Sequence, residues 1–299
     1  MFTPHLRAVL QALLVAFLWS TSWVLIKIGL SHDIPPLTFA GLRYTLAFLC
    51  LLPLFLRRPG VFVLLREQPH STWIKLVVLG LLFYTATQGA QFVGLALLPA
   101  ATVNLLLVCT AVVVALLGAW FLAERPTRVQ WGGIAIYLIG AVVYFYPAAL
   151  AGEQLLGILV VAGGVLANAG SSLLGRAINR DGTLPSLVIT TVSMGIGAVV
   201  LLAVGVITQG MPVLAPTEWL IIVWLAVVNT AFAFTLWNHT LRTLTALESS
   251  LINNTMLIQI PVLAWVFLGE VLTPKAILAL VVAGVGILVV QFKRVPGRS

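Results

Sequence analysis

The chain has 299 residues, of which 61% are hydrophobic and only 8% are charged. Average soluble proteins carry roughly 25% charged residues, so this composition excludes a soluble globular protein and indicates the bilayer as the main solvent. The net charge of +8 does not indicate nucleic acid, because the basic residues fall at the ends of apolar runs, where they set membrane topology. Cys50 and Cys109 lie within apolar runs and indicate no disulfide framework.

Ten apolar segments are long enough to cross a hydrocarbon core of ~30 Å as helices, which takes about 20 residues each. They cover approximately residues 8–29, 37–56, 73–94, 100–122, 129–147, 155–175, 185–207, 218–238, 247–268 and 275–292. The longest connection is too short for a soluble domain, and the first segment is long enough to span, so we expect no cleaved signal peptide. The sequence predicts an all-α integral membrane protein with ten transmembrane helices.

The second half of the chain repeats features of the first. Residues 121–127, Phe-Leu-Ala-Glu-Arg-Pro-Thr, recur 146 positions later as Phe-Leu-Gly-Glu-Val-Leu-Thr at residues 267–273. Each half holds five predicted spans, and an odd number of spans turns the second half upside down relative to the first. We therefore predict two inverted five-helix repeats, residues 1–150 and 151–299, an architecture common among secondary transporters.

The distribution of Lys and Arg predicts the orientation in the membrane. With the N-terminus in the cytoplasm, the inner side receives 13 of the 16 basic residues. The outer side receives only Lys275, while Lys27 and Arg43 lie inside spans or near their ends. Because cytoplasmic loops are enriched in Lys and Arg, we expect both termini to be cytoplasmic.

Four kinds of motif lie along the chain. They are Trp-Ser-Thr-Ser-Trp at residues 19–23, the Pro-Ala-Ala joint at 99–101, the paired Leu-x-Glu-x-x-Thr segments at 122–127 and 268–273, and Ala-Gly-Val-Gly at 283–286. In their order and spacing the chain resembles the ten-span EamA-type exporters of the drug/metabolite transporter superfamily, with the nearest likeness to bacterial exporters of aromatic and other amino acids. The resemblance implies alternating access through a central cavity between the repeats, in a bacterial inner membrane.

We therefore expect a secondary transporter that exports amino acids, including aromatic or other neutral ones. The alternative is an exporter of cationic or aromatic drugs or other small metabolites, because aromatic walls suit both cargoes. An enzyme is disfavoured, since the histidines are scattered and no HExxH or GxSxG spacing is present. A channel is disfavoured by the lack of a repeated filter sequence. We expect a small-molecule substrate and the lipid bilayer as partners, no nucleic acid, no cofactor or metal, and a monomer or weak homodimer.

Polar and aromatic side chains in the spans supply the candidate substrate-binding residues, because such groups at membrane depth usually face a bundle interior or a cavity. For a single Asn or Ser the competing role is an interhelical hydrogen bond, worth only ~0.6–2 kcal/mol. As a set they can build a cavity for an amphipathic solute. The predicted residues are Trp19, Ser20, Trp23, Arg43, Tyr44, Tyr84, Gln88, Gln91, Asn104, Asn168, Ser171, Trp237 and Asn253.

Arg43 and Lys27 are basic residues within spans, and each has two possible roles. Arg43 lies about two turns into the second span, where a guanidinium is costly unless it meets a partner or water. A substrate carboxylate is one such partner, because guanidinium can bind it with two hydrogen bonds; a helix-end carbonyl or a lipid headgroup is the other. Lys27 is nearer the outer end of the first span, where it either snorkels or contacts substrate.

Three acidic residues lie close to the spans. Glu124 and Glu270 each lie three residues before a Thr that can begin the next helix. The free N–H groups at the start of a helix can donate to a carboxylate, so we interpret both Glu residues as turn residues. Thr127 and Gln130 have the spacing of a capping box. Glu248 begins the ninth span, where the helix N-terminus stabilises a carboxylate; proton coupling is the alternative.

Overall fold

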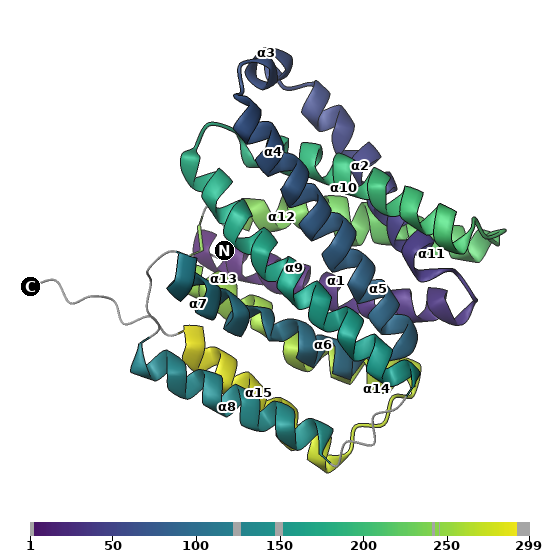
Figure 1. Cartoon of the computed structure of the whole chain (residues 1–299), viewed down its shortest axis with the longest axis vertical. Helices are drawn as coiled ribbons and strands as arrows, with labels where there is room; N and C mark the ends of the chain where they lie inside the picture. Colours follow the sequence, from purple (N-terminus) through teal and green to yellow (C-terminus); the bar gives the residue numbers. More distant parts are fainter. Residues whose placement is uncertain (1–2, 122–126, 147–151, 241–242, 245, 292–299) are drawn as a thin grey trace, which may run out of the picture.

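The structure, a computed structural model, describes residues 3–121, 127–146, 152–240, 243–244 and 246–291, which form helices joined by short connections (Figure 1). The first half contains α1 (Pro4–Ser31), α2 (Pro36–Leu56), α3 (Val61–Arg66), α4 (His70–Leu79), η1 (Gly80–Thr87), α5 (Gln88–Leu97), α6 (Ala100–Val108), α7 (Thr110–Phe121) and α8 (Arg128–Phe145). The second contains α9 (Glu153–Asp181), α10 (Ser186–Gln209), α11 (Pro216–Ala226), η2 (Val227–Phe232), α12 (Ala233–Thr240), α13 (Ala246–Asn254), α14 (Met256–Leu268) and α15 (Pro274–Gln291).

Local sequence signals explain several helix ends. Thr3 accepts a hydrogen bond from the Leu6 amide and Pro4 occupies the first turn of α1, where a missing N–H costs nothing. The capping box predicted at Thr127 is confirmed, because its hydroxyl accepts from the Gln130 amide while the Gln130 side chain accepts from the Thr127 amide. At the other end of a helix, Gly182 adopts the left-handed conformation that terminates α9.

Seven helices in the described part of the chain are long and apolar enough to cross a membrane. They are Pro4–Ser31, Pro36–Leu56, His70–Leu97, Arg128–Phe145, Glu153–Asn179, Ser186–Gln209 and Pro216–Trp237. The predicted fourth, ninth and tenth segments correspond to shorter apolar helices, Ala100–Val114, Ile252–Leu268 and Pro274–Val290. Turns at Cys109 and Thr255 interrupt two of the predicted segments. The all-helical character of the described residues is confirmed, and ten spans stay a prediction.

Two of the long helices contain a π-helical segment that the sequence pattern did not predict. In η1, the Thr87 hydroxyl donates to the carbonyl of Leu82, five residues earlier, at 2.8 Å. In η2, the Thr230 hydroxyl donates to the carbonyl of Leu225, again five residues earlier, at 2.8 Å. Segments of this kind are rare and often lie at functional sites, because they change the direction in which neighbouring side chains point.

Helices from the two halves pack in pairs. α2 packs along α10, and α8 packs along α15 at one edge of the molecule (Figure 1). Small residues permit the second pairing: a Cβ on Gly133 would lie 2.6 Å from the Val290 amide nitrogen, and one on Gly140 would lie 2.6 Å from that of Ala283. Close backbone approach at glycine is a usual way for helices to associate in a membrane. Between these pairs lie α1, α5, α6, α9 and α14, which surround the cavity.

Candidate functional site

A cavity of about 550 Å³ lies among helices of both halves. Its wall combines aromatic rings, side-chain amides and hydroxyl groups with apolar side chains from α6, α7 and α14. Among the described residues that line it, Arg43 is the only one with a formal charge. A cavity of this size and mixed polarity suits a small amphipathic molecule.

Aromatic contacts hold one part of the wall in place. Trp19 of α1 packs between Phe234 and Trp237 of α12, with ring centroids 5.4 Å and 5.2 Å apart. Trp19 and Phe234 line the cavity, whereas Trp237 contacts Trp19 without lining it. Phe83 and Trp23 add further rings to the wall. The wall therefore offers flat apolar surface on which a ring or an aliphatic side chain can pack.

Arg43 of α2 is only 4% exposed, yet it reaches the cavity. Its Nε donates to the Thr230 Oγ1 of η2 at 3.2 Å. Its guanidinium carbon lies 5.1 Å from the ring centre of Tyr44 and 5.9 Å from that of Phe92, which is the range of cation–π attraction. No carboxylate of the described residues lies within 4 Å of it. The guanidinium is thus anchored through Nε, and its outer N–H groups have no ionic partner in the described chain.

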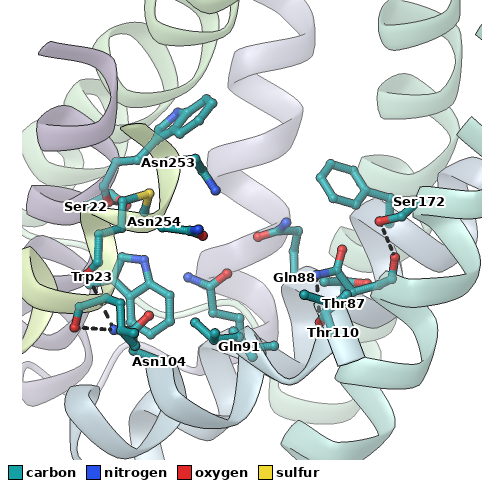
Figure 2. A pocket seen from close by; sticks show the side chains of 18 of the residues that line it. Ser22, Trp23, Thr87, Gln88, Gln91, Asn104, Thr110, Ser172, Asn253 and Asn254 are labelled. Atoms are coloured by element: carbon teal, nitrogen blue, oxygen red, sulfur yellow. Dashed lines mark hydrogen bonds between the residues drawn. The ribbon is translucent and has the colours of Figure 1, made fainter. Parts of the chain in front are cut away.

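Side-chain amides form the polar part of the wall. Figure 2 shows Gln88, Gln91, Asn253 and Asn254 turned toward a common space. The Gln88 oxygen accepts a hydrogen bond from the Tyr44 hydroxyl at 2.6 Å. These side chains come from α5 and α13, so both halves of the chain contribute amide groups to one space.

Nine of the thirteen predicted substrate-binding residues line the cavity: Trp19, Trp23, Arg43, Tyr44, Gln88, Gln91, Asn104, Asn168 and Asn253. The other four, Ser20, Tyr84, Ser171 and Trp237, do not line it. Their locations have separate physical reasons. The substrate-binding role of all thirteen stays a prediction.

Helical register accounts for two of the four. Ser171 is buried and donates to the Asn168 carbonyl at 2.8 Å, while its neighbour Ser172 lines the cavity. Tyr84 lies within η1, where the wider turn breaks the α-helical register that would have aligned it with Gln88. Tyr84 is therefore buried beneath Tyr44, with ring centroids 5.7 Å apart, and Phe83 lines the cavity instead.

Interhelical contacts account for the other two. The Ser20 hydroxyl is buried 2.9 Å from both the Ala16 carbonyl and the Gln259 Oε1 of α14, so it joins two helices. Trp237 packs against Trp19 as described above. Both side chains stabilise the packing of α1, which carries the cavity-lining tryptophans.

Several contributing residues were not predicted. Ser22, Phe83, Thr110 and Phe234 line the cavity, but single hydroxyl or aromatic residues in an apolar run give little signal. Thr230 holds Arg43 without lining the cavity. The adjacent polar pair Asn229-Thr230 within an otherwise apolar segment was the signal that could have identified it.

Lys27 and Glu270 meet at the end of the helices beyond the cavity. The Lys27 Nζ lies 3.9 Å from the Glu270 Oε1. The Glu270 carboxylate also accepts from the first amides of α6, at 2.7 Å from Ala100 and 3.4 Å from Ala101. Glu270 does not cap the helix that follows it, because Thr273 caps that helix by accepting from the Ala276 amide, and the interpretation of Glu270 as a turn residue stays a prediction. Glu270 instead ties its own connection to α6 of the first half.

Of the other two acidic residues considered in the sequence, Glu248 is described by the structure and Glu124 is not. The Glu248 carboxylate lies 2.8 Å from the His5 Nε2 and links α13 to the beginning of α1. This contact is partly exposed to solvent and lies outside the residues that line the cavity. Glu124 lies outside the described residues, so the predicted turn there has no structural account.

A helical membrane fold around a solute-sized cavity is typical of multi-pass membrane transporters. The chain belongs to the EamA-like transporter family, whose sequence profile matches residues 6–146 and 155–292. These two blocks cover nearly the whole chain.

Individual relatives agree with this family. The chain is 28% identical over 237 residues to a probable amino-acid metabolite efflux pump of Salmonella typhimurium, covering 76% of this chain and 75% of the relative. It is 27% identical over 304 residues to the uncharacterized transporter YoaV of Bacillus subtilis, covering 96% and 97%. One solved protein crystal structure has the same fold, with a TM-score of 0.67, 23% identity and coverage of 95% of this chain and 97% of the other.

Proposed function

We propose that this protein exports amino acids, including aromatic or other neutral ones, by alternating access through the cavity. The observation that carries the proposal is Arg43, a buried guanidinium in the cavity wall with no carboxylate partner among the described residues. A substrate carboxylate would supply the missing counter-charge, and guanidinium is shaped to bind it through two parallel hydrogen bonds. The aromatic wall would hold the substrate side chain.

The proposed architecture is ten spans in two inverted repeats, residues 1–150 and 151–299, with both termini on the cytoplasmic side of a bacterial inner membrane. The pairing of α2 with α10 and of α8 with α15 supports it, because these helices occupy equivalent places in the two halves. The π-helical segments support it too, since η1 and η2 lie in the third and eighth predicted spans. One chain encloses the cavity, so we propose a transporting monomer, alone or in a weak homodimer, with no enzymatic activity.

Export of cationic or aromatic drugs is the second candidate, and the aromatic wall favours it. Trp19 and Phe234 line the cavity, and aromatic rings can attract a flat cation. Arg43 argues against it, because a like charge in the same buried space disfavours a permanent cation.

Uptake of a panel of labelled amino acids and one labelled aromatic cation into proteoliposomes, with and without a pH gradient, tests the proposal. We expect saturable uptake of at least one aromatic or neutral amino acid, and Arg43→Ala should impair it more than cation uptake. Stimulation by the gradient would indicate proton coupling, and equal rates would indicate facilitated export. Amino-acid uptake no faster than in empty liposomes would contradict the proposal, as would equal loss of both cargoes in the variant.

A further inference from the structure

We propose that hydrogen bonds within the cavity wall fix a donor side and an acceptor side, so that an amino acid binds with its carboxylate at Arg43 and Gln88 and its ammonium group at Asn104. This orientation rests on the proposed function, because it requires a substrate that carries both groups.

The donor side is formed by α2 and α5. Thr230 has one hydroxyl hydrogen, which it donates to the Leu225 carbonyl, so toward Arg43 it can only accept. This bond occupies the Nε of Arg43 and leaves the outer N–H groups of the guanidinium for a ligand. The Gln88 Oε1 accepts a hydrogen bond from the Tyr44 hydroxyl at 2.6 Å. The Gln88 NH₂ group is therefore the part of this side chain that can bind a ligand in the cavity. Both side chains therefore present N–H donors, as an anion requires.

The acceptor side is formed by α6. The Asn104 Nδ2 faces two backbone carbonyls of α14, those of Met256 at 3.5 Å and Leu257 at 3.4 Å. A carbonyl cannot donate, so the NH₂ group of Asn104 must be the part that faces α14. Asn104 is 4% exposed and lines the cavity, so its Oδ1 atom is the part of the side chain that can accept a hydrogen bond from a ligand. An amide oxygen that accepts no hydrogen bond from the described part of the chain suits an ammonium group.

The surroundings of Asn104 agree with this assignment. Figure 2 shows Trp23 and Asn104 at the same edge of the cavity, with the Gln91 amide between this edge and Gln88. An indole ring attracts cations through its face, so Trp23 adds to the preference for an ammonium group. Gln91 carries both a donor and an acceptor and can hydrogen bond to either end of the substrate.

Binding of three ligands to the purified full chain in nanodiscs, measured by calorimetry, tests the orientation. L-Phenylalanine carries both groups, 3-phenylpropionate lacks the ammonium group, and L-phenylalaninamide lacks the carboxylate. Asn104→Leu and Asn104→Ala should each weaken phenylalanine binding about tenfold, as expected for the loss of one hydrogen bond to a charged group. Neither should change the affinity for 3-phenylpropionate. Arg43→Gln should show the opposite pattern, weakening both carboxylates and sparing the amide.

Asn179→Leu is the matched control, because the Asn179 Nδ2 also donates to a helix carbonyl, that of Gly175, at an exposed position outside the cavity. It should bind all three ligands like the parent. Equal loss of phenylalanine and 3-phenylpropionate in both Asn104 variants would overturn the orientation while leaving the proposed function standing. A parent protein that binds none of the three ligands, together with no amino-acid uptake in the panel, would overturn the proposed function itself.

Discussion

Lys27 and Arg43 are both basic residues within helical spans, but their surroundings differ. Lys27 lies near the end of α1 with the Glu270 carboxylate 3.9 Å away, and its side chain keeps 23% of its exposure. Arg43 is 4% exposed, is held by the neutral Thr230, and has no carboxylate within 4 Å among the described residues. A charge at membrane depth persists when it is paired or when it serves function. From this difference we propose that Lys27 belongs to the scaffold and that Arg43 binds the substrate.

The largest expected effect follows from removing the unpaired cation. Arg43→Gln keeps a polar side chain but removes the charge that we propose binds the carboxylate. Hydrogen bonds to charged groups contribute roughly 1.5–3 kcal/mol, so kcat/KM for the preferred amino acid should fall at least about tenfold. Uptake of an aromatic cation should fall less, and initial rates in proteoliposomes measure both. A proportional loss of both substrates would indicate general damage to the cavity instead.

The next largest effect is a loss of stability expected from removing Glu270, the ionic partner of Lys27. Glu270→Ala removes the carboxylate that accepts from the Ala100 and Ala101 amides and leaves Lys27 without its partner. We expect a loss of unfolding free energy on the order of 1–3 kcal/mol, seen as a lower midpoint of thermal unfolding in detergent. The KM for amino acid should remain within about twofold, because Glu270 does not line the cavity. A large rise in KM at unchanged stability would indicate that Glu270 takes part in substrate binding. It would then contradict the proposed contrast between Lys27 and Arg43.

A smaller effect is expected from the group that orients Arg43. Thr230→Val keeps the shape of the side chain but removes the hydroxyl that accepts from Arg43 Nε. Loss of one such bond, worth about 0.5–1.5 kcal/mol, should raise KM for the amino acid roughly two- to tenfold, and Thr230→Ser should restore it. Thr235→Val is the control, because the Thr235 hydroxyl donates to the Ala231 carbonyl of its own span, at an exposed position outside the cavity lining. An unchanged KM in Thr230→Val would show that Arg43 needs no such support.

Much of the cavity could be predicted because polar and aromatic residues are rare in apolar spans and costly when they face lipid. Trp19, Trp23 and Gln91 are examples, since their α-helical spacing placed them on inward-facing stripes. Tyr84 could not be placed, because η1 shifts the hydrogen-bonding register and nothing in the hydrophobic pattern reports that shift. The contact of Glu270 with Ala100 joins residues 170 positions apart, so the local sequence pattern could not identify it.

The most direct test of the assignment compares Lys27→Gln with Arg43→Gln by counterflow of labelled phenylalanine in proteoliposomes. The two variants lose the same charge from neighbouring spans, but Lys27 does not line the cavity. Lys27→Gln should keep the half-saturation concentration of the parent within about twofold, while Arg43→Gln should raise it at least about tenfold. The reverse order, or equal shifts in both variants, would contradict the assignment of Arg43 to the substrate carboxylate.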